Sequence, residues 1–268
     1  MFFDKFERQV QVTGTLRCAT ALRIGSGKSL DSVAADLPVL KDSLGRPFIP
    51  GASVKGVVRS SVEAVLRGMA ATPDETVAWT CDPLSAPCTR GESEAGLSLK
   101  ESRKRAVAVR EDLERGLCLV CRTFGAPGLA SHVVFRDLVP LGDARVERRD
   151  GVAIDRDLGR VSGARKYDFE VVAPGSAFQF VLELDSPEPW QEGLVAIGLD
   201  LLDQGVARLG GAKSRGLGVV KFEELAVRTL TKESLVAGEA PMVSGYGDWR
   251  KSVLVSWTDK VGQMKGRR

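Results

Sequence analysis

The sequence is poor in histidine, in aromatic residues and in long apolar runs. His132 is the single histidine, which argues against Ser-His-Asp and Cys-His nucleophiles and against any mechanism that needs two imidazoles. Because His132 opens an apolar stretch, we expect a strand-end residue with a satisfied ring nitrogen. Aromatic residues are only 6% of the chain, and they form no pattern like the paired aromatics of an RNP motif.

Long apolar segments are also missing. No run of 18 apolar residues occurs, so a membrane-spanning helix is not expected. The first five residues, Met1–Lys5, lack the apolar core and cleavage site of a signal peptide. These features predict a soluble, cytoplasmic protein without a membrane partner.

The chain does contain enough apolar sequence for a core. Its 268 residues are 43% hydrophobic and 27% charged, as expected for one elaborated domain or two small ones. The net charge is only +3, but basic residues cluster at 100–105, at Lys213 and Arg215, and at 265–268. Such clusters indicate either an anionic partner or, more commonly, a solvated face.

Hydrophobic spacing predicts the order strand, helix, strand, strand, helix, strand. One or two strands are expected over 10–24, and single strands at 132–139, 176–184 and 219–227. Helices are expected at 53–68, with Ser53 as N-cap, and at 190–206. This α+β order is the split βαβ, or ferredoxin-like, arrangement: an antiparallel sheet with two helices on one face. Residues 70–131 are predicted to be an insertion with a charged helix over 97–117, and residues 141–168 a protruding loop or hairpin.

The insertion contains two short-spaced cysteine pairs. Cys81 and Cys88 form C-x6-C, Cys118 and Cys121 form C-x2-C, and 29 residues separate the pairs. Four thiolates in this pattern suit a tetrahedral structural Zn²⁺ site, whereas disulfides are not expected in the cytosol. Three thiolates with another ligand, or unligated thiols in a loop, are the alternatives. Cys18 lies in the apolar first strand and is expected to be part of the core.

Two segments with glycine and basic residues are candidate phosphate sites. In residues 49–59, a Pro-Gly turn leads into a helix N-terminus, which favours an anion. Lys55 and Arg59 are one turn apart there and share a face, although a solvated face explains the spacing equally well. In residues 210–218, glycines allow close approach of a ligand, with Lys213 and Arg215 between them. This loop is not a P-loop, because no Gly-Lys-Ser/Thr opens a helix after it.

Several motifs follow one another in a specific order over residues 8–228. They are Gly25–Gly27, Asp36–Asp42, Ile49–Gly56, Phe124–Gly125, Phe135–Asp137, Val152–Arg156 and the glycine loop 210–218. In this order they resemble the RAMP superfamily, and within it the repeated backbone subunit of type III CRISPR effector complexes. The backbone modules of single-chain effectors are similar.

The resemblance implies a domain plan and a set of partners. It implies a ferredoxin-like domain over 1–228 with a zinc-binding insertion at 70–131, a thumb hairpin at 141–170 that wedges into the guide–target duplex, and a C-terminal extension at 229–268 outside the similarity. The implied partners are a CRISPR guide RNA, a target RNA and other RAMP subunits of the complex. The guide-contacting residues that it implies are Arg23, Lys28, Lys55, Arg59, Arg156, Lys213 and Arg215.

The resemblance also implies that Asp36 supports cleavage of the target RNA with Mg²⁺ or Mn²⁺. RNA brings its own nucleophile, the 2′-hydroxyl, so a positioned phosphate and one carboxylate holding a hydrated ion suffice. A turn cap is the alternative role for Asp36. The leading hypothesis is therefore a guide-binding subunit that cleaves target RNA, followed by the same scaffold without nuclease activity. A stand-alone guide-processing endoribonuclease is disfavoured by the single histidine.

Overall fold

One antiparallel sheet organises the chain in the computed structural model, which describes residues 5–27, 35–71, 79–82, 88, 117–126, 129–154, 157 and 161–265. The strands of this sheet are β1 (Arg8–Cys18), β2 (Val133–Phe135), β3 (Pro140–Leu141), β6 (Ala177–Asp185), β7 (Val220–Thr231) and β8 (Met242–Gly245). The order is β2-β6-β1-β7-β8, and β3 also pairs with β6. The first four strands of that order have the split βαβ arrangement, so the predicted α+β class is confirmed.

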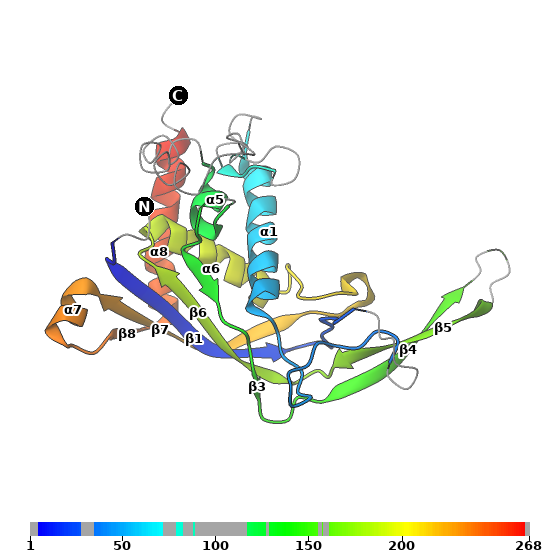
Figure 1. Ribbon diagram of the computed structural model, residues 1–268. Helices are drawn as coiled ribbons and strands as arrows, with labels where there is room; N and C mark the ends of the chain where they lie inside the picture. Colours follow the sequence, from blue (N-terminus) through cyan, green and yellow to red (C-terminus); the bar gives the residue numbers. More distant parts are fainter. Residues whose placement is uncertain are drawn as a thin grey trace, which may run out of the picture.

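All the large helices lie on the same face of the sheet (Figure 1). They are α1 (Gly51–Met69), α6 (Pro189–Asp203) and α8 (Tyr246–Lys265), with the shorter α5 (Leu119–Phe124) beside them and α7 (Lys232–Ala237) at the far end of the sheet. Among these described helices, none combines the length and the apolar character that crossing a lipid bilayer requires.

The core lies between this helical layer and the sheet. Alternate residues of β1 and β6 face the helices, so Val10, Val12, Phe178 and Phe180 are fully buried. From the other side, α1 contributes a buried stripe at helical spacing, namely Val54, Val58, Val62 and Leu66. Cys18 is buried in the same core, as the sequence predicted.

The helix α1 begins differently from the prediction. Its N-cap is Pro50, so Ser53 lies inside the helix and the prediction of Ser53 as N-cap is wrong. The backbone N–H of Gly51 instead donates to Oδ1 of Asp137 at 2.8 Å. A Cβ atom on Gly51 would lie 2.0 Å from the carbonyl oxygen of Phe135, so this crossing of helix and β2 requires glycine. The carboxylate of Asp137, far away in the sequence, therefore accepts a hydrogen bond at the start of α1, where Ser53 was expected to be the cap.

The bounds of β1 and β2 also differ from those that the sequence predicted. Over the range 10–24, where one or two strands were expected, β1 ends at Cys18, and β2 has three residues where eight were expected. His132 precedes β2, is buried, and its Nδ1 lies 2.6 Å from the carbonyl oxygen of Asp185. This is the predicted strand-end role. The C-terminal segment, which sequence reasoning left uninterpreted, forms α7, β8 and α8, and α8 buries Trp249, Val253 and Trp257 against the rest of the chain.

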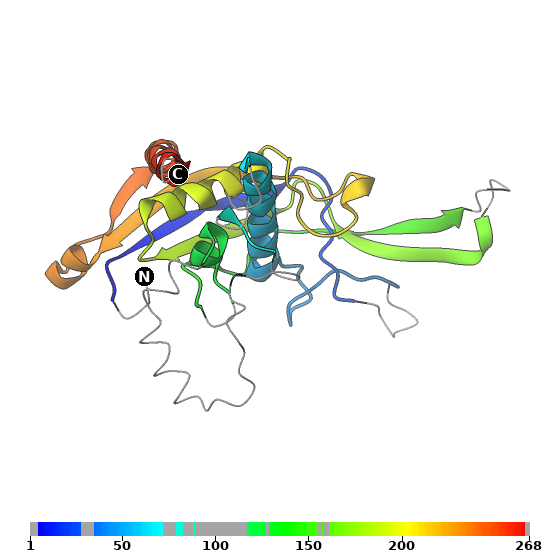
Figure 2. The same ribbon diagram turned by 90° about the horizontal axis from the view of Figure 1, so that it is seen from above.

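A second, two-stranded sheet projects from one end of the molecule (Figure 2). It consists of β4 (Val146–Ile154) and β5 (Val161–Val172), which pair as an antiparallel hairpin. The hairpin and the α7–β8 unit lie at opposite ends of the structure. Lys28, Arg156 and residues 97–116 of the predicted insertion helix lie outside the described residues.

Candidate nucleic-acid interface and metal centre

The hairpin is held to the main body at residues Tyr167–Glu170 of β5, here called the hairpin base. The loop that carries Asp36 runs along this base. Leu37 forms a parallel bridge with Phe169, and Glu170 accepts hydrogen bonds from the backbone N–H of Val39 and from Nζ of Lys41, both at 3.0 Å. The conformation of the loop is thus held by contacts with β5, a strand that lies more than a hundred residues later in the sequence.

Asp36 itself pairs with Asp168 of the hairpin base. The backbone N–H of Asp36 donates to Oδ1 of Asp168 at 2.7 Å, and the backbone N–H of Asp168 donates to Oδ2 of Asp36 at 3.1 Å. The second carboxylate oxygen of Asp168 forms an ion pair with Arg148 of β4. Asp36 is exposed, and among the described residues its carboxylate accepts a hydrogen bond from another strand rather than from its own turn.

The glycine loop, residues 210–218, also contacts the hairpin base. The 3-10 helix η1 (Lys213–Arg215) lies within it, and both Lys213 and Arg215 are exposed. Nη1 of Arg215 donates to Oη of Tyr167 at 2.7 Å, with the guanidinium 6.0 Å from the ring centroid. Arg215 and Asp36 therefore contact two residues that are adjacent in β5, Tyr167 and Asp168.

Arg23 lies where the glycine loop meets the end of the first strand region. Gly210 has φ 77°, and a Cβ there would lie 2.3 Å from the carbonyl oxygen of Arg23. The backbone N–H of Gly211 donates to that oxygen at 2.8 Å. The Nε atom of Arg23 is buried and has no hydrogen-bond partner among the described residues. The predicted RNA-binding side chain is thus packed between glycines and retains an unsatisfied donor.

Lys55 and Arg59 share one face of α1, as predicted, but both contact the protein. Nζ of Lys55 donates to the carbonyl oxygen of Val133 at 3.0 Å, and burial, followed by repulsion from Arg59, lowers the pKa of Lys55. The guanidinium of Arg59 donates to Glu63 at 2.9 Å and to the carbonyl oxygen of Gly125 at 3.0 Å. Its Nη2 also lies 3.6 Å from Sγ of Cys121.

The four cysteines of the insertion meet beside α1. The Sγ atoms of Cys81, Cys88, Cys118 and Cys121, here called the cysteine cluster, all lie within 4.8 Å of one another. The Cys81–Cys121 sulfur distance is 3.6 Å and the Cys88–Cys118 distance is 3.9 Å. All four are free thiols, since a disulfide would bring two sulfurs to about 2.05 Å.

This donor set fits a tetrahedral metal ion. Metal–sulfur bonds of about 2.3 Å in a tetrahedron separate neighbouring sulfurs by about 3.8 Å, which is close to the two distances above. The pKa of Cys118 is lowered to about 5, because hydrogen bonds from the Cys121 side chain and, against the opposing effect of burial, from its backbone N–H favour the thiolate. The cluster can therefore hold a metal ion, and two of its ligands come from α5 and its cap: Cys121 within the helix and Cys118 at the N-cap.

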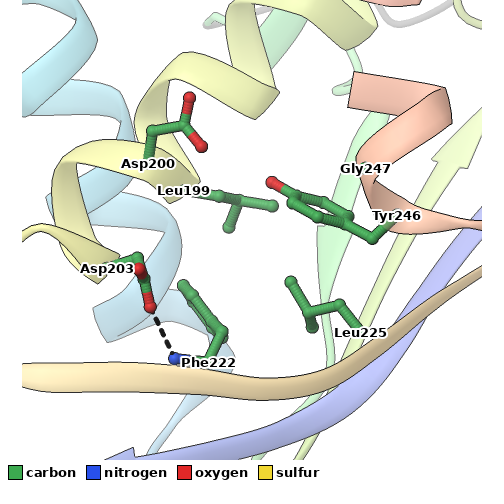
Figure 3. Close-up of a pocket in the computed structure, with 7 residues that line it drawn as sticks. All are labelled: Leu199, Asp200, Asp203, Phe222, Leu225, Tyr246 and Gly247. Carbon is green, nitrogen blue, oxygen red and sulfur yellow. Dashed lines mark hydrogen bonds between the residues drawn. The ribbon is translucent and has the colours of Figure 1, made fainter. Parts of the chain in front are cut away.

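A separate pocket lies between α6, β7 and α8 (Figure 3). Its volume is ≈ 320 Å³, and its lining includes Asp200, Asp203 and Tyr246. Asp203 accepts from the backbone N–H of Phe222 at 2.8 Å, and Asp200 binds Arg250 at 2.6 Å. Both carboxylates are thus engaged by groups of the protein itself.

The fold is an elaborated ferredoxin-like one, because a split βαβ sheet is covered by helices on one face. The elaboration is the projecting hairpin, whose base contacts both the glycine loop and the loop that carries Asp36. Fold alone does not assign a function to such a protein. The chain belongs to the RAMP superfamily, whose family model matches residues 15–221.

Curated relatives match most of the chain. Each of the following is named CRISPR system Cms endoribonuclease Csm3. The Mycobacterium tuberculosis protein is 29% identical over 245 residues, which cover 82% of this chain and 89% of the relative. The Methanothermobacter thermautotrophicus protein is 25% identical over 272 residues, covering 89% and 94%. The Methanocaldococcus jannaschii protein is 25% identical over 240 residues, covering 84% and 83%.

The structure also identifies residues that sequence reasoning missed. Asp137, Tyr167 and Asp168 each hold a predicted site segment in place. Asp137 lies in the motif Phe135–Asp137 used for the resemblance, so a signal existed, but its partner Gly51 was not evident. Tyr167 and Asp168 carried no signal, because their importance comes from the segments that pack against them.

Proposed function

We propose that this chain is a guide-RNA-binding backbone subunit of a type III CRISPR effector complex and that it cleaves complementary target RNA. The observation that carries the proposal is the position of Asp36, which is exposed and pairs with Asp168 at the hairpin base, next in sequence to Tyr167, the partner of Arg215. The relatives named endoribonuclease, together with membership of the RAMP superfamily, support it. Other RAMP subunits of the complex are the expected protein partners.

Guide binding in this proposal is electrostatic. Lys213 and Arg215 are exposed cations on a loop whose backbone can approach a ligand closely, and the backbone of Arg23 is hydrogen-bonded to the same loop through Gly211. Such cations bind phosphates without reading base sequence. Lys55, Arg59, Lys28 and Arg156 stay predictions as guide contacts, the first two because their polar groups already contact the protein.

Cleavage requires that a 2′-hydroxyl lie in line with the neighbouring phosphorus. The projecting hairpin, with the thumb role that the resemblance implies, would displace a target nucleotide at its base and so align these atoms. Oδ2 of Asp36 is occupied by Asp168, whereas Oδ1 has no hydrogen-bond partner among the described residues. A Mg²⁺ or Mn²⁺ ion bound there would supply stabilisation of the charge that develops on the phosphate. Attack by the 2′-oxygen leaves a 2′,3′-cyclic phosphate and a 5′-hydroxyl.

The cysteine cluster has a structural role in this proposal. We assign it Zn²⁺, because four sulfurs at tetrahedral spacing are the ligand set that structural zinc prefers. The cluster joins Cys81 and Cys88 to α5, whose Leu119, Val120 and Phe124 are buried in the core, and a metal ion would tie the two segments together there. Zinc in this position contributes to folding rather than to cleavage.

The decisive experiment uses the assembled complex with guide and complementary target RNA. Cleavage is expected with Mg²⁺ and not with EDTA. Asp36→Ala should abolish cleavage but leave assembly and target affinity intact, because the carboxylate acts on the transition state and base pairing supplies affinity. Asp42→Ala is the matched control: Asp42 braces its own turn by accepting from the backbone N–H groups of Leu44 and Arg46, both at 2.9 Å. Cleavage by Asp36→Ala at the wild-type rate would refute the assignment.

A non-catalytic scaffold is the second candidate function. The observation that favours it is the hydrogen bond between Oδ2 of Asp36 and the hairpin base, which gives the aspartate a structural role without catalysis. In that case the wild-type complex binds target RNA and never cuts it under any divalent ion, and Asp36→Ala lowers stability instead of activity.

A further inference from the structure

We propose that Asp168 is a positioning residue for Asp36, so that the hairpin base sets the orientation of the cleavage aspartate. This inference rests on the role proposed above for Asp36. It concerns a residue that does not touch the reacting atoms and acts only through its neighbour.

The pairing of the two aspartates is reciprocal. Each backbone N–H donates to the other residue's carboxylate, at 2.7 Å from Asp36 and at 3.1 Å from Asp168. Two hydrogen bonds in opposite directions fix both the backbone of Asp36 and the rotation of its side chain. The carboxylate of Asp168 is itself held by Arg148, and only 13% of its side chain is exposed. The negative charge of Asp168 is therefore compensated by Arg148, although the side chain lies next to the carboxylate of Asp36.

The edge of β5 explains why a carboxylate lies here. Alternate N–H groups of this edge donate to the loop side: Asp168 to Oδ2 of Asp36, Glu170 to the carbonyl oxygen of Leu37 at 3.1 Å, and Val172 to that of Leu22 at 2.7 Å. Asp36 thus supplies with its side chain the acceptor that a strand would supply with a carbonyl. Oδ2 is used in this way, whereas Oδ1 accepts no hydrogen bond from the described residues, and we assign the ligand to Oδ1.

The consequence is a direct link between hairpin and cleavage loop. A shift of the hairpin base moves Asp168, and with it both the main chain and the carboxylate of Asp36. Misplacement of a reacting group by about 1 Å can cost about 10²-fold in rate, whereas RNA affinity depends on separate cations. The link therefore acts on the rate of the bound complex.

The test measures single-turnover cleavage by the assembled complex at saturating target RNA, as a function of Mg²⁺ concentration. Asp168→Ala should lower the maximal rate at least tenfold and raise the half-saturating Mg²⁺ concentration, with target affinity within twofold of wild type. Asp168→Asn keeps an Oδ1 acceptor for the N–H of Asp36 and should retain the rate within about threefold. Glu147→Gln, on strand β4 of the same hairpin, is the matched control, because the Glu147 carboxylate is exposed and contacts Arg149 at 3.4 Å; it should leave the Mg²⁺ dependence unchanged.

The possible failures are distinguishable. If wild type cuts, Asp36→Ala does not, and Asp168→Ala cuts with wild-type rate and Mg²⁺ dependence, only the positioning role is overturned. If Asp36→Ala also cuts normally, or wild type never cuts, the proposed function fails and this inference with it. Should Asp168→Ala not assemble, Asp168→Val provides the same test, because valine favours a strand and offers no acceptor.

Discussion

Oδ1 of Asp137 accepts a hydrogen bond at 2.8 Å from the backbone N–H of Gly51, 86 residues earlier in the chain. This bond satisfies one of the free N–H groups at the start of α1, and it places a negative charge at the positive end of the helix. The helix N-terminus that the sequence offered for a phosphate is thus occupied by a carboxylate of the protein itself.

Asp137→Ala should therefore destabilise the fold. Loss of an N-terminal capping acceptor costs roughly 0.5–2 kcal/mol, which lowers Tm by about 2–4 °C for each kcal/mol in a chain of this size. Asp137→Asn keeps an oxygen acceptor and should lose less. Thermal unfolding of the purified chain measures both. Asp143→Ala is the control, because the Asp143 side chain is 78% exposed and contacts Arg145 at 3.1 Å; equal Tm values for all variants would contradict the capping role.

The cysteine cluster predicts one zinc ion per chain. Substituting any one of its four cysteines by serine should lower metal content and Tm, and chelation should unfold or loosen the wild-type chain, because metal binding contributes to folding. Elemental analysis of protein purified without added zinc, and thiolate-to-metal absorption after Co²⁺ substitution, measure occupancy. Cys18→Ala, a buried cysteine outside the cluster, should leave occupancy unchanged. A zinc content near zero with all five thiols freely titratable would rule out the site.

Lys213 and Arg215 predict a salt-dependent, sequence-independent affinity for guide RNA. Each lost phosphate contact should reduce the slope of log affinity against log salt by about 0.7 on a single strand. The double variant Lys213→Gln, Arg215→Gln should therefore reduce it by about 1.4, equally for guides of different sequence. Titration at several salt concentrations gives the slope, and an unchanged slope would show that the groove lies elsewhere.

Arg59→Gln is the informative comparison in that experiment. Its contacts with Cys121 and Glu63 predict that it supports the cysteine cluster, so the variant should lose metal about 10–100-fold more readily while the salt slope stays unchanged. Release of metal to a chelator measures the first effect. A slope reduced as much as for Lys213→Gln would instead favour the guide contact that the sequence predicted.

Glu192 predicts a pH dependence of stability. Burial raises its pKa above the usual 4.5, against the lowering effects of Arg8 and Trp249. As pH rises above 4.5, the unfolded chain loses this proton before the folded chain does, so this residue's contribution to stability falls, by at most about 1.4 kcal/mol per pH unit. Glu192→Gln removes that titration, so the difference between the Tm of the variant and the Tm of the wild type should shift in favour of the variant as pH rises from 4 to 7. Parallel Tm curves for the two proteins would contradict the shift.

The sequence by itself determined the elements whose cause is local. The valine spacing of α1 and the alternation of Phe178, Phe180 and Leu182 in β6 reflect which face is buried, and this periodicity is readable without knowledge of the partner. The paired spacing of the four cysteines was enough to predict that they meet. The order of the motifs was enough to indicate the family.

Only the tertiary structure decided which side chains hold these segments together. Asp36 and Asp168 are 132 residues apart, Arg59 and Cys121 are 62 apart, and neither pair has a local pattern. Their contacts follow from sheet pairing and helix packing, which bring distant residues together in a register that no short window of sequence encodes. For the same reason the start of α1 was misplaced: a local serine was available as a cap, but β2 and the residues after it placed Asp137 nearer to the first N–H.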